Sequence, residues 1–147
     1  MKDIEIAKNL LTKEDLTLVI VKNGEVIYMS NKKGISPLFW AVKDVKESLK
    51  DSSVADKVIG KAAAMLCSYA GINELHTNVV SEKAIEILNR TKIMYQYENL
   101  CSFIKNRDNT GICPVEALAL NTESIEELLT GIQKFLINIS NEQRFWI

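Results

Sequence analysis

The stretch ELHTNVVSEKAIEILNRTKIMYQYENL, residues 74–100, predicts a strand, a short helix and a second strand in succession. Ser81 is placed to cap the helix, and KIMYQYENL forms the second strand. Two consecutive strands that are joined through a helix lie parallel, with a right-handed crossover. This stretch decides the fold class, because it requires an α/β architecture with parallel strands.

The residues before this stretch predict an antiparallel hairpin. LTLVIVKNGEVIYMS, residues 16–30, places β-branched runs on both sides of Asn23 and Gly24, a pair that tolerates positive φ at both turn positions. Apolar residues at helical spacing predict a helix over residues 2–12. A Ser-Pro pair predicts the start of a further helix, over residues 37–49.

Two more helices are predicted from their start and stop signals. DKVIGKAAAMLCSYAG, residues 56–71, indicates a buried helix with Asp56 as its N-cap and Gly71 as its left-handed C-terminal residue. TESIEELLTGIQKFLI, residues 122–137, indicates a final amphipathic helix capped by Thr122. This order of elements implies a three-layer α/β/α architecture, a mixed sheet with helices on both faces.

Composition narrows the classes of function. The chain has 147 residues, 47% of them apolar and 25% charged, as expected for a single domain over residues 1–147. A formal net charge of -1 offers no basic surface for nucleic acid, and no apolar run is long enough to span a membrane. Cys67, Cys101 and Cys113 are odd in number and far apart, which favours reduced thiols over disulfides. We expect a cytoplasmic protein without nucleic-acid or membrane partners.

Two motifs carry a resemblance to a known family. DKVIGKAAA, residues 56–64, and NRDNTGICPVE, residues 106–116, resemble a bacterial family of a domain of unknown function, DUF1893. The order of a leading helix, an antiparallel hairpin and then helix-strand-helix-strand resembles the cytidine-deaminase-like superfamily, to which that family is assigned. The resemblance implies a cytidine-deaminase-like fold over most of the chain.

The chain lacks the residues of a zinc deaminase. Such an enzyme needs a His or Cys with a catalytic Glu at the start of one helix, and Cys-x-x-Cys at the start of the next. The corresponding helix starts here, DKVIGKA and SEKAIEI, hold neither histidine nor cysteine. The alternative is a zinc site built from His76 and the three cysteines, but their spacing is not that of chelating residues. We expect no metal, no cofactor and no zinc-dependent deamination, with His76 as a hydrogen-bonded structural residue.

The resemblance implies that two helix N-termini converge where the zinc would lie, and each offers a positive dipole end with unpaired N–H groups. The first would carry Lys57 and Lys61, which are four residues apart and would share a face. We interpret these lysines as part of an anion-binding site, with Asp56 at the cap and Ser81 at the second helix. Gly60 would let a backbone or a ligand approach closely. The alternative is that both lysines extend into solvent.

A cysteine precedes the helix predicted to begin at Pro114. Proline suits the first helical position, which makes Cys113 the N-cap and places Glu116 at the third position, where a carboxylate can bond back to the N–H of the cap. Helix N-termini lower thiol pKa values, so Cys113 is a candidate nucleophile or redox-sensitive thiol, with Glu116 or a lysine managing protons. The alternative is a buried thiol that packs against the sheet.

The polar loop NRDNTG, residues 106–111, lies just before this cysteine. Asn106 and Asp108 favour tight turns, and Arg107 is a planar side chain suited to anions, so the loop is a candidate ligand contact. The alternative is a solvated turn in which Arg107 pairs with Asp108.

Three functions stay open at this level. The first is a module that binds a small anionic, nucleotide-like metabolite at the helix ends. The second is an enzyme that uses Cys113, and the third is a structural or assembly protein. The apolar residues Phe145, Trp146 and Ile147 predict a docking surface, either on the same domain or on a second copy in a homodimer.

Overall fold

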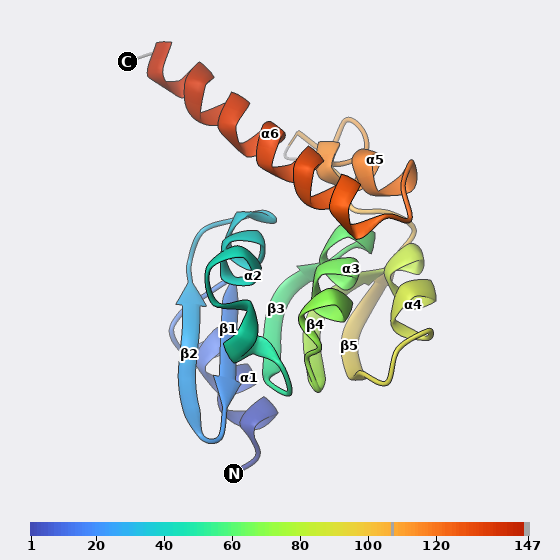
Figure 1. The fold of residues 1–147 in the computed structure, drawn as a ribbon. Coiled ribbons are helices and arrows are strands. Elements are labelled where there is room, and N and C mark those ends of the chain that lie inside the picture. The colour runs from blue at the N-terminus through green and yellow to red at the C-terminus, as the bar shows by residue number, and fades with distance from the viewer. Residues whose placement is uncertain (107, 146–147) are drawn as a thin grey trace.

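The chain folds into an alternating series of helices and strands (Figure 1), in a computed structural model that describes residues 1–106 and 108–145. In chain order the elements are α1 (Asp3–Lys13), β1 (Leu18–Lys22), β2 (Glu25–Ser30), α2 (Ser36–Leu49), β3 (Ser53–Ile59), α3 (Lys61–Ala70), β4 (Glu74–Ser81), α4 (Glu82–Leu88), β5 (Met94–Cys101), α5 (Pro114–Leu120) and α6 (Ile125–Phe145).

The strands form one mixed sheet in the order β2-β1-β3-β4-β5. β1 is antiparallel to both β2 and β3, whereas β3, β4 and β5 run parallel to one another. The predicted parallel pair on either side of α4 is therefore confirmed. The leading helix, the hairpin and the two strands around α4 follow one another as the sequence predicts.

The β1–β2 hairpin turns through Asn23 and Gly24, as predicted. Their φ angles of 53° and 80° are both positive, which is the geometry of the type I′ turn that an Asn-Gly pair favours. The two carboxylate oxygens of Asp3 accept hydrogen bonds from the backbone N–H groups of this pair, each at 2.9 Å. These bonds fix the start of α1 against the turn.

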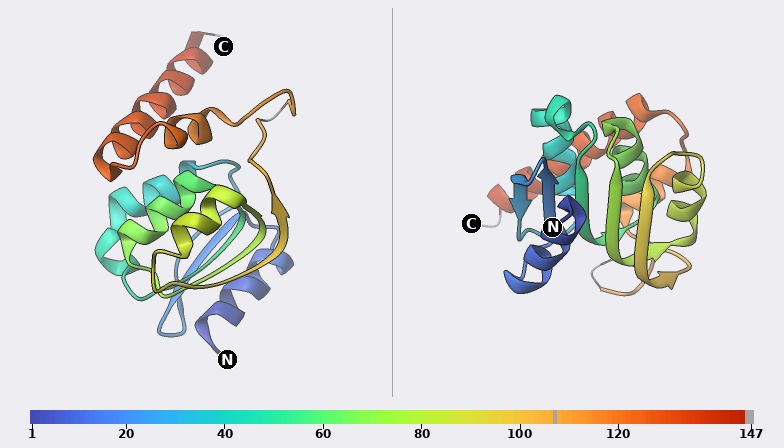
Figure 2. Two further views of the ribbon diagram at one scale, coloured as in Figure 1. Left: turned by 90° about the vertical axis from the view of Figure 1, so that its right-hand side faces the viewer. Right: turned by 90° about the horizontal axis from the view of Figure 1, so that it is seen from below.

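Helices cover both faces of the sheet, which confirms the three-layer architecture (Figure 2). α1 lies on one face, where Ala7 and Leu11 pack against Val19, Val21 and Ala55. α2, α3 and α4 lie on the other face and enclose the larger core, to which α5 and α6 add side chains from one end of the molecule.

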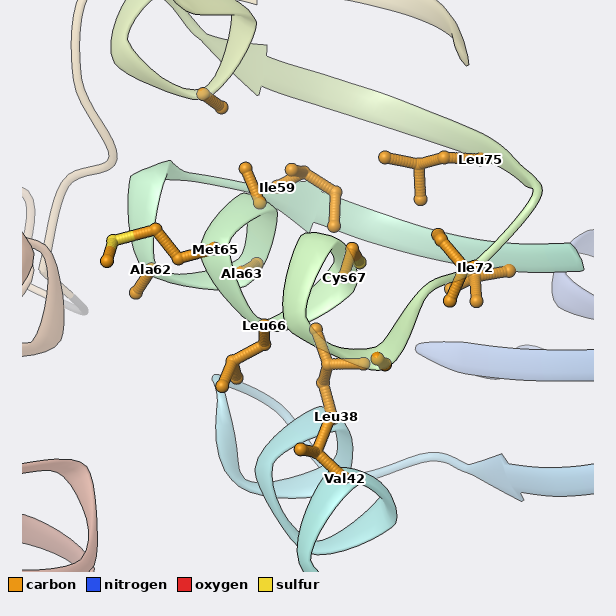
Figure 3. Packing of buried hydrophobic residues seen from close by; sticks show 14 of the residues in the cluster. Leu38, Val42, Ile59, Ala62, Ala63, Met65, Leu66, Cys67, Ile72 and Leu75 are labelled. Carbon is orange, nitrogen blue, oxygen red and sulfur yellow. The ribbon is translucent and has the colours of Figure 1, made fainter. Parts of the chain in front are cut away.

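Helix α3 lies at the centre of the larger core (Figure 3). Its alanines at 62–64 are buried together with Leu66 and Cys67, and its neighbours are α2, α4, α5 and α6. A helix that is apolar on nearly every side is stable only when it is enclosed. Gly71, with φ of 71°, ends the helix in the left-handed conformation that the sequence predicts.

The sequence interpretation of residues 56–59 as the first turn of a helix is wrong. These residues belong to β3, which lies between β1 and β4 in the middle of the sheet, and α3 begins only at Lys61. The error has a physical origin, because Ile59 lies three residues before Ala62 and is buried in the same core. The end of a strand therefore imitated one turn of a helical stripe, and Asp56 is a strand residue rather than an N-cap.

Helix α6 packs against α3 and α5 and buries Leu128 and Ile132 as predicted. Its predicted cap at Thr122 is wrong, because Ser124 immediately precedes the helix and its Oγ accepts a hydrogen bond from the N–H of Glu127 at 3.3 Å. No helix within residues 1–106 and 108–145 is both long and apolar enough to cross a membrane.

The predicted apolar docking group at the end of α6 falls largely outside the described residues. Trp146 and Ile147 are not among them, and α6 is described to Phe145.

Asp56 faces the larger core. It lies opposite Leu18 of β1 in the antiparallel ladder, and Leu18 belongs to the core that α3 covers. Burial raises the pKa of the Asp56 carboxyl from 3.8 to about 7, although its Oδ1 accepts a hydrogen bond from the N–H of Val58 at 3.3 Å. Folding thus favours the protonated form, so stability falls as the pH rises from about 4 to about 7.

The substitution Asp56→Asn is expected to remove this pH dependence. Asparagine keeps an oxygen acceptor for Val58 but carries no charge. Near pH 8 the free energy of unfolding of the variant should exceed that of the unsubstituted protein by about 2 to 4 kcal/mol. One pKa unit corresponds to about 1.4 kcal/mol, and the range allows for the fact that Asp56 is only half-buried. Near pH 4 the two should differ little, because both are then neutral at this position.

Urea unfolding at several pH values measures both effects. Asp44→Asn, which changes an exposed carboxylate on α2, is the matched control and should leave the pH profile unchanged. A profile for Asp56→Asn parallel to that of the unsubstituted protein would contradict the assignment.

Candidate functional site

Three parallel strands end at one edge of the sheet, and the helix starts gather there (Figure 1). β3 ends at Ile59 just before α3, β4 ends at Ser81 just before α4, and β5 ends at Cys101, beside Ser81 in the ladder. The segment after β5 returns toward α5, where the N–H of Cys113 donates to the carbonyl of Ile104 at 2.9 Å. α5 then packs across α3, so three helix starts surround this edge.

A carboxylate from α5 occupies the start of α3. Oε2 of Glu116 accepts a hydrogen bond from the N–H of Lys61 at 2.8 Å, and Oε1 accepts one from the N–H of Ala62 at 3.2 Å. These N–H groups have no partner within their own helix, and the positive end of the helix dipole lies there too. Glu116 is only 7% exposed, so it acts as an internal anion at the helix start.

The prediction that Glu116 bonds back to the N–H of its own N-cap is wrong. The cap is Cys113, as predicted, but its N–H is held by the carbonyl of Ile104 instead. The carboxylate is therefore free to reach the neighbouring helix α3, a contact that local sequence rules cannot anticipate.

Gly60 makes room for this carboxylate. It is the N-cap of α3 and has no side chain with which to cap the helix. A Cβ on its backbone would overlap with the carboxylate of Glu116. The close approach at Gly60 is thus made by a side chain of α5, whereas the sequence suggested a backbone or a ligand.

Lys61 is buried and already paired. Its side chain is 7% exposed, and its Nζ lies 3.1 Å from Oε1 of Glu123 and 3.4 Å from the carbonyl of Thr122. The hydrogen bond from Lys61, and then its charge, lower the pKa of the Glu123 carboxyl. This ion pair ties the start of α3 to the turn between α5 and α6.

Lys57 does not share a face with Lys61, and that part of the sequence interpretation is wrong. Because Lys57 lies on a strand, its side chain pairs with Asp15 beyond the end of α1, with Nζ and Oδ1 3.2 Å apart. Asp56 faces the core in mid-strand. The structure therefore brings Gly60, Lys61 and Glu116 together and places the other two predicted residues elsewhere.

A pocket of about 380 Å³ adjoins Glu116 at this edge. It is lined by Ser81, Lys83, Ser102, Phe103, Ile112, Glu116 and Leu120. Ser81 caps α4 as predicted, with its Oγ accepting from the N–H of Ala84 at 3.1 Å. Burial raises the pKa of the Glu116 carboxyl, and the N–H bonds from α3 and the charge of Lys61 offset this only in part, so its neutral form is favoured more than usual.

Sequence reasoning identified two of the lining residues, Ser81 and Glu116, and missed the others. Phe103 and Leu120 are 45% and 46% exposed, and this exposure of apolar side chains indicates a pocket only once the fold is known. Lys83 lies two residues after the cap residue Ser81, and in the sequence it looks like an ordinary solvated lysine. The missed residues come from three separate segments, and only tertiary structure brings these together.

The loop before α5 uses its polar side chains to form a turn. Oδ1 of Asn106 accepts hydrogen bonds from the N–H groups of Thr110 at 3.0 Å and Gly111 at 3.4 Å. Asp108 is exposed, and Arg107 lies outside the described residues. Asn106 thus has a local structural role, and the predicted ligand contact of this loop stays a prediction.

The three cysteines lie in different surroundings. Cys113 is half-buried against the larger core, makes no capping hydrogen bond with its side chain and does not line the pocket. Cys101 is half-buried at the end of β5, and burial, followed by the charges of Glu116 and Glu82, raises its pKa. Cys67 is fully buried, and burial followed by the charge of Asp56 raises its pKa well above the ordinary value.

Within the described part of the chain, no three His, Cys, Asp or Glu side chains form a group that could hold a metal ion. His76 is buried on the α1 face, opposite Ala55 of β3, and burial followed by the charge of Lys8 lowers its pKa. Its Nδ1 finds no hydrogen-bond partner among those residues, so the prediction of a hydrogen-bonded histidine is wrong for that atom.

The fold and this edge define a class of α/β domain with a five-stranded mixed sheet, in which a carboxylate from α5 caps the central helix. The chain belongs to the TM1506 family, the domain of unknown function DUF1893, whose profile matches residues 6–136.

The solved structures that are similar to this chain include the following two. A crystal structure of a DUF1893 family protein, TM1506 from Thermotoga maritima, is 27% identical in sequence, with a TM-score of 0.82 over 91% of this chain and 90% of that chain. Acinetobacter baumannii RibD is 20% identical, with a TM-score of 0.45 over 82% of this chain and 36% of that chain. No curated protein matches the chain.

The substitution Gly60→Ala is expected to lower the free energy of unfolding by about 2 to 4 kcal/mol, because the new methyl group displaces Glu116 from the start of α3. Gly131→Ala in α6 is the matched control. A methyl group there would meet only Leu118, at 3.5 Å, so that change should be neutral or stabilising by up to about 1 kcal/mol.

A double substitution separates overlap from other effects of the alanine. The double variant Gly60→Ala with Glu116→Ala has no carboxylate to overlap with the new methyl group. Its loss in free energy of unfolding should therefore be smaller than the sum of the losses in the two single variants. Chemical denaturation measures each value. Additive losses would rule out a direct contact between these residues.

The cysteines should differ in their rates of alkylation by iodoacetamide near neutral pH. Cys67 should stay unmodified in the folded protein because it is buried and its pKa is raised, and Cys101 should react slowly because its pKa is raised too. Mass spectrometry after timed labelling resolves the sites, and Cys113→Ser assigns any fast phase to Cys113. Rapid labelling of Cys67 in folded protein would contradict its placement, while denatured protein should label at all three sites.

Proposed function

We propose that this chain is a binding module for a small metabolite with an apolar, nucleotide-base-sized body and one anionic group, held in the pocket beside Glu116. The observation that carries the proposal is the pocket itself, about 380 Å³ at the carboxyl edge of three parallel strands. Ligand sites in open α/β folds lie outside the carboxyl ends of strands, and pockets of this size accommodate small organic molecules.

The pocket walls fit an apolar body. Phe103, Ile112 and Leu120 contribute apolar side chains from two segments, and Phe103 and Leu120 are nearly half exposed. A ligand that covers exposed apolar side chains on a concave surface binds favourably, because apolar surface is removed from water. Ser81 and Ser102 add hydroxyl groups that can fix the orientation of the ligand.

The rim of the pocket fits an anionic group. Lys83 lines the pocket with its side chain 52% exposed, and its Nζ makes a 3.4 Å ion pair with Glu86, which a ligand anion could replace. Lys105 adds a positive charge near Cys101, where it offsets a small part of the rise that burial and the charges of Glu116 and Glu82 cause in the pKa of that thiol. Both carboxylate oxygens of Glu116 accept hydrogen bonds from N–H groups of α3, which offsets part of its negative charge beside the pocket.

The start of α3 is not the anion site in this proposal, since Glu116 already accepts the N–H groups of Lys61 and Ala62 there, and the ammonium of Lys61 pairs with Glu123. The proposal therefore moves the anionic group from the start of α3 to the rim beside α4. The odd, unpaired cysteines favour a cytoplasmic location for the module.

A pair of dyes tests the proposal. Anilinonaphthalene sulfonate has an apolar body with one sulfonate, and phenylnaphthylamine has the same body without a charge. We expect the sulfonate dye to bind at one site per chain and more tightly than the neutral dye. Lys83→Gln should weaken binding of the sulfonate dye about fivefold, because it removes the partly exposed cation that would pair with the sulfonate. Binding of the neutral dye should stay unchanged.

Ile112→Trp fills the pocket and should weaken both dyes. Lys92→Gln, which removes an exposed lysine before β5, is the control and should weaken neither. Circular dichroism confirms that each variant is folded, since partly unfolded proteins also bind this dye. Binding that survives Ile112→Trp, or an equal loss of both dyes in Lys83→Gln, would sink the proposal.

A further inference from the structure

Strand β5 is an uncovered edge of the sheet. It is last in the strand order and pairs only with β4 among the strands described. Six of its eight residues are exposed, and Figure 1 shows β5 as the last strand of the sheet, with α4 beside it. Its outward backbone N–H and C=O groups are therefore available to another strand.

The side chains of β5 do little to prevent such pairing. Met94, Tyr97 and Leu100 are 56%, 44% and 51% exposed, and Glu98 is the single formal charge between Met94 and Cys101. Edge strands are usually protected by lysine, proline or a bulge. β5 contains neither lysine nor proline, and its pairs with β4 keep one register on both sides of Glu98, which is itself not paired in the ladder.

The opposite edge of the sheet differs. β2 begins with the charged Glu25, and its register with β1 shifts between Ile20 and Val21. That irregularity increases local twist and makes continued pairing less favourable. The two edges of one sheet thus carry different side-chain and backbone features, and only β5 has the features of a strand that pairs with another chain.

We propose that β5 pairs with β5 of a second copy of this chain, antiparallel and centred on Tyr97, so that two five-stranded sheets join across a two-fold axis. A two-fold interface brings the same strand of each copy together, and this requires the strands to run antiparallel. The proposal concerns assembly and is independent of the ligand pocket.

The register follows from the one charge on the strand. When the axis passes through Tyr97, Glu98 lies opposite Gln96 of the second copy, and Met94 lies opposite Leu100 of the second copy. Seven of the eight residues then pair, and the carboxylate has an amide as its neighbour.

Neighbouring symmetric registers are unfavourable. An axis through Glu98 sets two carboxylates directly opposite each other, and an axis through Gln96 sets Glu98 against Met94 of the second copy. Like charges opposite each other destabilise a strand pair, and a charge against an apolar side chain loses water without gaining a partner. The sequence of β5 is therefore complementary to itself in one central register.

The tyrosines support the same register. The rings of Tyr95 and Tyr97 are stacked, with centroids 6.4 Å apart and an interplanar angle of 18°. An axis at Tyr97 brings the Tyr97 rings of the two copies together and extends this pair into an aromatic row across the interface. Aromatic pairs across strands are among the more favourable contacts in sheets.

Two substitutions at one exposed position test the proposal with opposite expectations. Gln96→Glu places two pairs of like charges across the axis and should raise the Kd of the dimer about tenfold or more. Gln96→Lys places Lys opposite Glu98 twice and should leave the dimer intact or tighten it. Sedimentation equilibrium over a range of protein concentrations measures the Kd of each.

A compensating change checks the register. Gln96→Glu with Glu98→Lys again sets opposite charges across the axis and should restore the dimer. Met29→Glu, at a position that is also exposed, on the opposite edge strand β2, is the control and should not change the Kd. High salt should reduce the difference between Gln96→Glu and Gln96→Lys.

A protein that stays monomeric at the highest concentration would overturn the proposal. So would a dimer that Gln96→Glu leaves intact, or one that Met29→Glu disrupts. Circular dichroism on every variant separates loss of pairing from loss of fold.

Discussion

The carboxylate of Glu116 on the first N–H groups of α3 is the contact on which this structure depends. α3 is buried at the centre of the larger core, so its start has no water to satisfy its orphan donors. Gly60 cannot cap the helix with a side chain, and its lack of Cβ is what lets Glu116 approach. The buried carboxylate and the buried helix start therefore stabilise each other, and each would be unfavourable alone.

This contact also determines where α5 and α6 lie. Glu116 holds α5 over α3, and the ion pair between Lys61 and Glu123 holds the turn that follows. α6 then closes the core with Leu128 and Ile132. Helices α5 and α6 are thus held at the start of α3 by polar contacts, and apolar packing against the core adds to them.

The same contact redirects the functional interpretation. A helix start at the carboxyl edge of a sheet attracts anions, but here the protein supplies its own anion. The pocket that remains lies beside Glu116 rather than on the axis of α3, between α4, α5 and the segment after β5. A ligand there would meet apolar walls and a lysine at the rim, which is why the proposed metabolite has both an apolar and an anionic part.

The sequence alone determined the local elements and the fold class. The Asn23-Gly24 turn, the Ser81 cap and the two strands around α4 follow from short-range geometry, and they imply the α/β architecture. It did not reveal β3, because Ile59 at the strand end has the spacing of a helical residue, and only pairing with strands on both sides distinguishes the two. It also placed Glu116 correctly on its helix but with the wrong partner. Tertiary structure decided that partner, since residues 61 and 116 are far apart in the chain and meet only when α5 packs on α3.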